Sequence, residues 1–102
     1  MNRLTPAACL AVLALAAGPA AAQDPNLGRN LAATCANCHG TDGRAVPAAG
    51  MPPLAGMAKE SIVQRFREYR SGTRPATVMH QIAKGYTDAQ LELIAAHLAA
   101  QK

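Results

Sequence analysis

The sequence predicts an all-α fold in one small domain that closes around a non-protein group. Apolar residues recur at helical spacing in three segments, and the sequence around the cysteine pair lacks the alternation typical of a strand. The only aromatic residues are Phe66, Tyr69 and Tyr86 in a chain of 102 residues. A small domain buries a limited share of its surface, so such a thin core needs something else to fill its centre.

Residues 1–22 have the layout of a secretory signal. One cation, Arg3, precedes an apolar run over residues 7–17, and small residues end at Ala22. The apolar run is shorter than the roughly 20 residues that a membrane-spanning helix needs, which disfavours an uncleaved anchor. We expect cleavage after Ala22, a periplasmic location, no membrane span after cleavage, and a single domain of residues 23–102.

The first predicted helix carries the cysteine pair. Asp24 and Pro25 fit its N-cap and first helical position, because Asp accepts bonds from free N–H groups and Pro lacks the donor. Apolar side chains recur every four residues from Leu27 to Cys35, which predicts a helix of about three turns with Cys35 on its buried face. Gly28 either admits a second helix at close range or is simply a weak helix residue.

A long irregular loop is predicted after this helix, over residues 40–57, because the stretch holds four glycines and three prolines. The pattern becomes helical again from Ala58 and ends at Ser71–Gly72. The expected inner face of this second helix consists of Ile62, Val63, Phe66 and Tyr69 or Arg70.

The C-terminal part is predicted to hold a short helical turn and a final helix. Gly85 fits the C-cap of the short turn. Thr87 and Gln90 have the spacing of a capping box, in which each side chain bonds the backbone N–H of the other residue. The apolar stripe of the final helix consists of Leu91, Ile94 and Leu98.

The stretch TCANCHG sets an imidazole directly after two thiols that are three positions apart. A zinc site would need four protein ligands, and no second Cys or His pair stands at matching spacing. A thioredoxin-like redox pair would need βαβ surroundings, which this sequence does not offer. The C-x-x-C-H order indicates covalent attachment of one haem c, with Cys35 and Cys38 forming the thioether bonds and His39 ligating the iron.

Methionine is the predicted second axial ligand. Two methionines of the Pro/Gly loop follow His39 closely and are expected on the same side of the ring, whereas Met79 comes forty residues later, far enough to reach the opposite face. His/Met ligation raises the reduction potential of haem iron. His80 and His97 are the alternatives to Met79, and a solvated surface imidazole is the other interpretation of both.

With these residues in place, GRNLAATCANCHG and the later methionine and helix resemble class I cytochromes c over nearly all of residues 23–102. The segment SGTRPATVMHQIAKGYTDAQLELIAAHLAAQ is similar to the C-terminal part of the haem subunit of flavocytochrome c sulfide dehydrogenase. The resemblance implies the small class I fold wrapped around one covalent haem, thioether sites at Cys35 and Cys38, axial ligands His39 and Met79, and an FAD-containing sulfide dehydrogenase subunit as partner. Some haem subunits of that family have two haem domains, whereas this chain has one motif.

The resemblance also places a proline carbonyl beside the axial histidine. A ligating His donates its other N–H to a fixed acceptor, for which Pro52 is the first choice and Pro53 the alternative; the competing interpretation is that these prolines only stiffen the loop. Candidates for contacts with the haem propionates, or else for ordinary solvated side chains, are Tyr69, Arg70, Arg74 and Lys84.

The expected role is electron carriage without enzymatic activity of the chain itself. It fits either a subunit bound tightly to the flavoprotein or a freely diffusing carrier that serves a terminal oxidase or another periplasmic redox protein. An obligate partner leaves a broad apolar patch, and the apolar loop from Met51 to Met57 favours the subunit. A haem enzyme or ligand sensor would require Met79 to be off the iron. The scattered basic residues and few aromatics do not predict nucleic-acid binding.

Overall fold

The structure is a computed structural model that describes residues 24–102, so the predicted secretory signal of residues 1–22 lies outside the described residues. Over the described range the chain forms helices joined by turns and loops, and no strand occurs there. The predicted all-α fold is confirmed. In chain order the elements are α1 (Leu27–Ala32), η2 (Ala33–Cys35), α2 (Ala36–His39), η3 (Thr41–Gly43), α3 (Lys59–Ser71), α4 (Met79–Lys84) and α5 (Asp88–Ala99).

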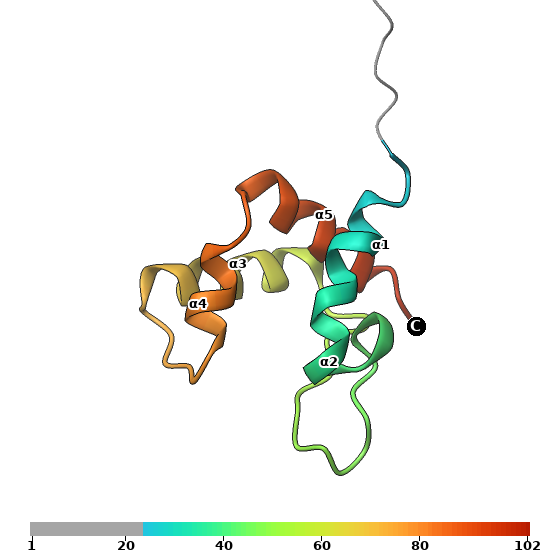
Figure 1. The fold of residues 1–102 in the computed structure, drawn as a ribbon, viewed down its shortest axis with the longest axis horizontal. Coiled ribbons are helices and arrows are strands. Elements are labelled where there is room, and N and C mark those ends of the chain that lie inside the picture. The colour runs from blue at the N-terminus through green and yellow to red at the C-terminus, as the bar shows by residue number, and fades with distance from the viewer. Residues whose placement is uncertain (1–23) are drawn as a thin grey trace, which may run out of the picture.

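The core lies where α5 meets α1 on one side and α3 on the other, with α4 packed against α3. Figure 1 shows α4 at the left of the molecule and α2 at the bottom, with α5 above α2 and beside α1. The helices α1, α3, α4 and α5 contribute the buried apolar side chains, and their burial supplies the main favourable term in folding. The buried apolar side chains are Ala32, Ile62, Val63, Phe66, Ala83, Leu91, Ile94, Ala95 and Leu98.

The first helical segment runs through α1, η2 and α2 with a tighter 3₁₀ turn in the middle. Its predicted start was wrong, because α1 begins at Leu27 and its N-cap is Asn26 rather than Asp24. Asp24 instead closes a turn before the helix: its Oδ1 accepts from the Asn26 N–H at 2.8 Å and its backbone oxygen accepts from the Leu27 N–H at 3.1 Å. Cys35 is half-buried.

Gly28 lies at the crossing of α1 and α5. A Cβ atom at this position would stand 2.8 Å from the backbone oxygen of Leu93 on α5. That separation is too short for a carbon atom to occupy without displacement of one helix. The close approach of a second helix, one of two predicted roles for Gly28, is therefore the correct one.

The boundaries of the later helices agree with the sequence signals. Gly72, with φ of 80°, is the left-handed C-cap of α3, and Gly85 is the C-cap of α4. At the start of α5, the Thr87 hydroxyl accepts from the Gln90 N–H at 3.1 Å and the Gln90 side chain accepts from the Thr87 N–H at 2.9 Å. The capping box is confirmed, as is the buried stripe of α5.

The connection between α2 and α3 is irregular apart from the short helix η3, as predicted. Its two ends are held together by the carbonyl oxygen of Gly43, which accepts from the N–H groups of Leu54 at 2.8 Å and of Ala55 at 3.1 Å. Leu54 and Met57 then pack against the core. Among the helices of residues 24–102, none is long and apolar enough to cross a membrane.

Candidate functional site

His39 is the C-terminal residue of α2 and the buried polar side chain of the core, with 7% of its surface exposed. Its ring Nδ1 lies 2.9 Å from the carbonyl oxygen of Pro52, to which an Nδ1–H donates. In the neutral imidazole, a proton on Nδ1 leaves Nε2 as the unprotonated nitrogen that a metal ligand requires. Pro53, the alternative acceptor, makes no hydrogen bond to His39 within the described residues.

Cys35 and Cys38 lie one helical turn apart, at the end of η2 and in α2, where Cys35 is half-buried and Cys38 exposed. No disulfide joins the two sulfur atoms. Burial raises the pKa of the Cys35 thiol, outweighing the hydrogen bond to Thr34. A thioredoxin-like nucleophile needs a lowered thiol pKa, so this environment disfavours that chemistry.

Met79 is the first residue of α4. It is half-buried and packs against the apolar core. Met79 and His39, which are distant in sequence, line the same two hollows together with Leu54 and Phe66. The structure therefore brings the two predicted axial ligands to one place.

Two neighbouring hollows surround these residues. One holds the cysteine pair, and its remaining walls are uncharged: Thr34, Cys35, Cys38, His39, Met51, Leu54, Phe66, Val78, Met79, Ile82 and Tyr86. We call this the cysteine-side hollow. The other lies on the side away from the cysteines and is lined by His39, Pro52, Leu54, Met57, Ile62, Arg65, Phe66, Tyr69 and Met79. We call it the α3-side hollow.

The chemistry of these side chains fits haem c. Two thiols at one edge can form thioether bonds, an oriented imidazole and a thioether sulfur suit haem iron, and apolar walls suit a macrocycle. Phe66 lines both hollows and adds an aromatic apolar side chain to their walls. In a domain with so few aromatic residues, a group seated here also supplies the missing core volume.

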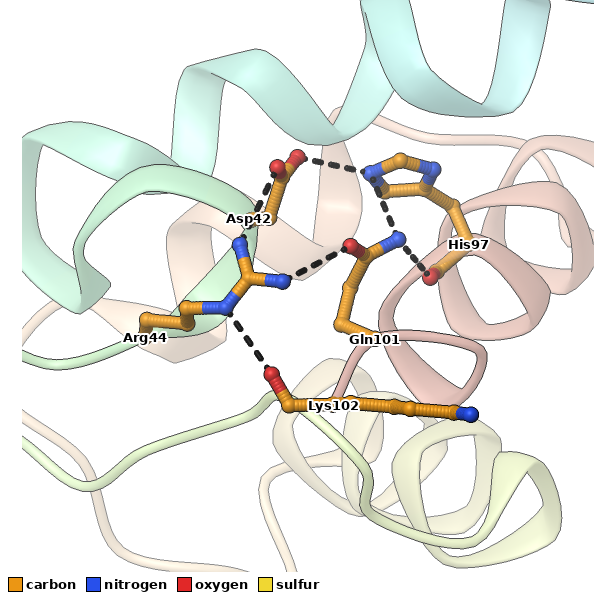
Figure 2. Close-up of polar contacts among 5 residues, drawn as sticks. All are labelled: Asp42, Arg44, His97, Gln101 and Lys102. Carbon is orange, nitrogen blue, oxygen red and sulfur yellow. Dashed lines mark hydrogen bonds and ion pairs between the residues drawn. The ribbon is translucent and has the colours of Figure 1, made fainter.

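The two rival histidines are placed differently. His97, on α5, has Nε2 at 2.9 Å from Oδ1 of Asp42, in a polar network with Arg44, Gln101 and the Lys102 carbonyl (Figure 2). This network is not part of either hollow. His80 lies beside Met79, but it lines a separate surface hollow, and its Nδ1 is buried without a hydrogen-bond partner in the described chain.

The four residues predicted as candidates for contact with the haem propionates differ in their surroundings. Arg70 donates to Asp88 and to the Tyr86 carbonyl, and Arg74 donates to Glu68, so both guanidinium groups have protein partners. Lys84 lines the separate hollow of His80. Tyr69 lines the α3-side hollow. Arg65 lines it too, and the sequence analysis missed this residue.

The fold and the site together define an electron carrier of the covalent-haem class. The family model described as cytochrome c matches residues 25–102, and the chain belongs to the cytochrome c family. Its cofactor is therefore covalently bound haem c, and the role of the chain itself is electron carriage rather than catalysis.

The chain is similar in sequence to two known proteins and in structure to a third. The cytochrome subunit of sulfide dehydrogenase from Chlorobaculum tepidum is 40% identical over 68 residues, covering 67% of this chain and 60% of that protein. The thiosulfate dehydrogenase electron acceptor of Stutzerimonas stutzeri is 39% identical over 74 residues, covering 72% of this chain and 34% of that protein. The solved structure of cytochrome c4 from Acidithiobacillus ferrooxidans has a TM-score of 0.63 and 34% identity, covering 72% of this chain and 49% of that one. The matched regions thus span 60% or less of each relative.

Proposed function

We propose that this chain carries single electrons through one haem c held by four residues. Cys35 and Cys38 form the thioether bonds, and His39 and Met79 are the axial ligands of the iron. The placement of His39 and Met79 on the walls of the same two apolar hollows, with the cysteine pair at one end, carries this assignment. When bound, the haem supplies a one-electron couple between ferric and ferrous iron.

The surrounding protein would set the reduction potential of that couple. The Pro52 carbonyl holds the His39 ring through Nδ1, so Nε2 would be the nitrogen that binds the iron. A thioether from Met79 raises the reduction potential, and the apolar walls exclude water and disfavour the more charged ferric form. His39 and Met79 would together leave no open position on the iron for a substrate, which fits a carrier.

The exposed edge of this site is apolar. The large exposed hydrophobic side chains of the described residues are Val46, Met51, Val78 and Ile82, and the last three line the cysteine-side hollow. That hollow has no Asp, Glu, Lys or Arg among its walls. Exposed apolar surface around the cysteine edge suits a close, desolvated contact with a partner better than a charged docking site does.

The partner proposed for this surface is an FAD-containing sulfide dehydrogenase subunit, which passes electrons to the haem in the periplasm after export directed by residues 1–22. The likeness to the Chlorobaculum tepidum cytochrome subunit of sulfide dehydrogenase supports this assignment. The alternative, a freely diffusing carrier to a terminal oxidase or another redox protein, is supported by the likeness to an electron acceptor of thiosulfate dehydrogenase.

Ligation is tested with Met79→Ala. The ferric wild type is expected to show a low-spin spectrum with the thioether-to-iron charge-transfer band, and the variant is expected to lose that band and to bind cyanide readily. Met57→Ala, which removes another methionine of the α3-side hollow, is the matched control and should keep the band. An unchanged band in Met79→Ala would refute the assignment.

The partner is tested by gentle purification of the native protein from the periplasm. Co-elution of haem and flavin at a fixed ratio, with reduction of the haem by sulfide, is the expected result. A small haem protein that elutes without flavin and does not respond to sulfide would favour the freely diffusing carrier instead. A domain of residues 23–102, set by N-terminal sequencing of the same material, is expected if cleavage follows Ala22.

A further inference from the structure

Arg65 stands apart from the other arginines of α3. Arg67 lies 3.9 Å from Glu92, and Arg70 pairs with Asp88. Arg74, beyond the end of the helix, donates to Glu68 at 2.7 Å. Arg65 makes no ion pair or side-chain hydrogen bond in residues 24–102, although its neighbours do. Its guanidinium is thus free to bind a group that is not part of the protein.

The position of Arg65 is specific. It belongs to the α3-side hollow, whose other walls are the His39 ring, the Met79 side chain and apolar residues. Arg65 is the Lys/Arg/Asp/Glu residue among those walls, and Tyr69, one turn later on α3, is the wall residue that carries a hydroxyl. A cation beside an otherwise apolar cavity indicates an anionic group at its mouth.

The attachment chemistry decides which part of haem lies there. The thioether bonds form at the two vinyl groups, and the two propionates project from the opposite edge of the macrocycle. A haem whose vinyl edge is tied to Cys35 and Cys38 in the cysteine-side hollow would have its propionate edge on the side away from them, toward the α3-side hollow. Arg65 is exposed at that position, so a carboxylate can reach it from the cavity.

We propose that Arg65 binds a haem propionate and acts as a positioning residue that raises the reduction potential of the iron. A guanidinium presents paired N–H donors that match a carboxylate. The cation also disfavours the ferric form, which carries one more positive charge than the ferrous form. This inference rests on the proposed haem-binding site and adds to it a residue that tunes the reduction potential of the iron.

The test compares Arg65→Gln with Arg67→Gln in the intact haem protein. Both variants lose one positive charge from α3, but Arg67 lies outside both hollows, so it controls for charge alone. Arg65→Gln is expected to lower the midpoint potential, seen as about a threefold or larger rise in the ferric-to-ferrous ratio at a fixed ambient potential, where tenfold corresponds to 59 mV for one electron. Arg67→Gln is expected to change the ratio much less.

A spectroscopic measurement distinguishes a direct contact between Arg65 and the propionate from a long-range effect of its charge. The propionate bending band in the resonance Raman spectrum should shift in Arg65→Gln and stay in place in Arg67→Gln. Unchanged potential and band in Arg65→Gln would overturn the proposal, and so would equal potential changes in both variants with no shift of the band. If Arg65→Gln fails to fold, Arg65→Lys decides, since it keeps the charge and loses the paired donors: a shifted band supports the contact and an unshifted one refutes it.

The same samples also show whether the proposed haem ligation itself is wrong. A wild-type spectrum without the thioether-to-iron band would remove the Met79 ligation on which the proposed haem-binding site depends. A wild type that shows the band, combined with an Arg65→Gln protein that is identical to it in potential and in the propionate band, would remove the role of Arg65 alone.

Discussion

The Nε2 atom of His97 on α5 lies 2.9 Å from Oδ1 of Asp42 in η3. The pair joins residues that are 55 positions apart and ties the turn after the C-x-x-C-H segment to the C-terminal helix (Figure 2). Arg44 adds a second connection, since its Nε donates to the Lys102 carbonyl at 3.0 Å. Gly43 lies between Asp42 and Arg44 in the sequence. A Cβ atom on Gly43 would stand 2.9 Å from Cδ2 of Leu98, which is too close for a side chain to fit.

Because of this pair, the free energy of unfolding of the domain is expected to depend on pH. The hydrogen bond with His97 is the largest cause that lowers the pKa of Asp42, with Arg44 and Arg29 acting in the same direction and desolvation opposing them. Because the pKa is lower in the folded state, the contribution is present above the ordinary Asp pKa and is lost as the pH falls through the folded value. Urea unfolding of wild type and Asp42→Asn should therefore differ most near neutral pH and converge in acid.

Asparagine is the appropriate replacement because Asp42 has φ of 54°, a left-handed conformation that Asn tolerates. A difference in the free energy of unfolding that stays constant across the pH range would contradict this account. It would mean that Asp42 acts through local backbone conformation alone.

Gly28→Ala is expected to destabilise the domain by about 1–3 kcal/mol through overpacking, because the new methyl group would meet the Leu93 carbonyl of α5. In an uncrowded helix the same replacement stabilises by roughly 0.5–1 kcal/mol, so the sign of the effect is diagnostic. Denaturant unfolding measures it. Asn30→Ala, at an exposed position of α1, is the control and should not destabilise; a stabilised Gly28→Ala protein would contradict the close helix crossing.

Thr87→Ala is expected to cost about 1 kcal/mol of stability, because it removes the hydroxyl that accepts from the Gln90 N–H at the start of α5. Thr87→Ser keeps that hydroxyl and should retain most of the stability. Thermal or denaturant melting of the haem protein measures both. Equal losses in the two variants would show that the methyl group, rather than the cap, matters.

Pro52→Ala separates the carbonyl of this residue from its ring. The carbonyl oxygen that accepts from His39 belongs to the backbone and remains in the variant, so the low-spin spectrum should persist. The loss of a rigid ring makes the unfolded chain more flexible, which should cost about 0.4–1 kcal/mol. If Pro52→Ala instead lost the low-spin spectrum, the ring rather than the carbonyl would be positioning His39.

The helices follow signals that are local in sequence. The stripe of Leu91, Ile94 and Leu98, the Thr87 capping box and the glycine at the end of α3 each depend on residues within a few positions, so periodicity and capping rules find them. The start of α1 was missed because Asp24 satisfies its own turn instead of the helix end. Side-chain caps compete with such local turns, and the sequence pattern is the same for both.

The sequence predicts the candidate site where it follows a fixed motif, and less of it elsewhere. The cysteine pair and His39 belong to one short pattern, and Met79 follows from the need for a second ligand. The Asp42–His97 pair leaves no periodic trace, because two polar residues far apart in sequence can meet only through the tertiary fold. Arg65 had a signal that was not used: it lies three positions after Ile62 and four before Tyr69, so it borders the inner face of α3.

The positions of His39 at the end of α2 and Met79 at the start of α4 also have a consequence for partly unfolded forms of the chain. Forty residues separate them, so a group bonded to both closes a loop that contains the whole irregular segment and α3. Closing such a loop removes chain entropy from every partly opened form in which both bonds persist. If Met79 and the cysteine pair hold the haem as proposed, loss of the Met79 bond would remove this constraint from α4 and the segment before it, whereas α2 would keep its thioether links.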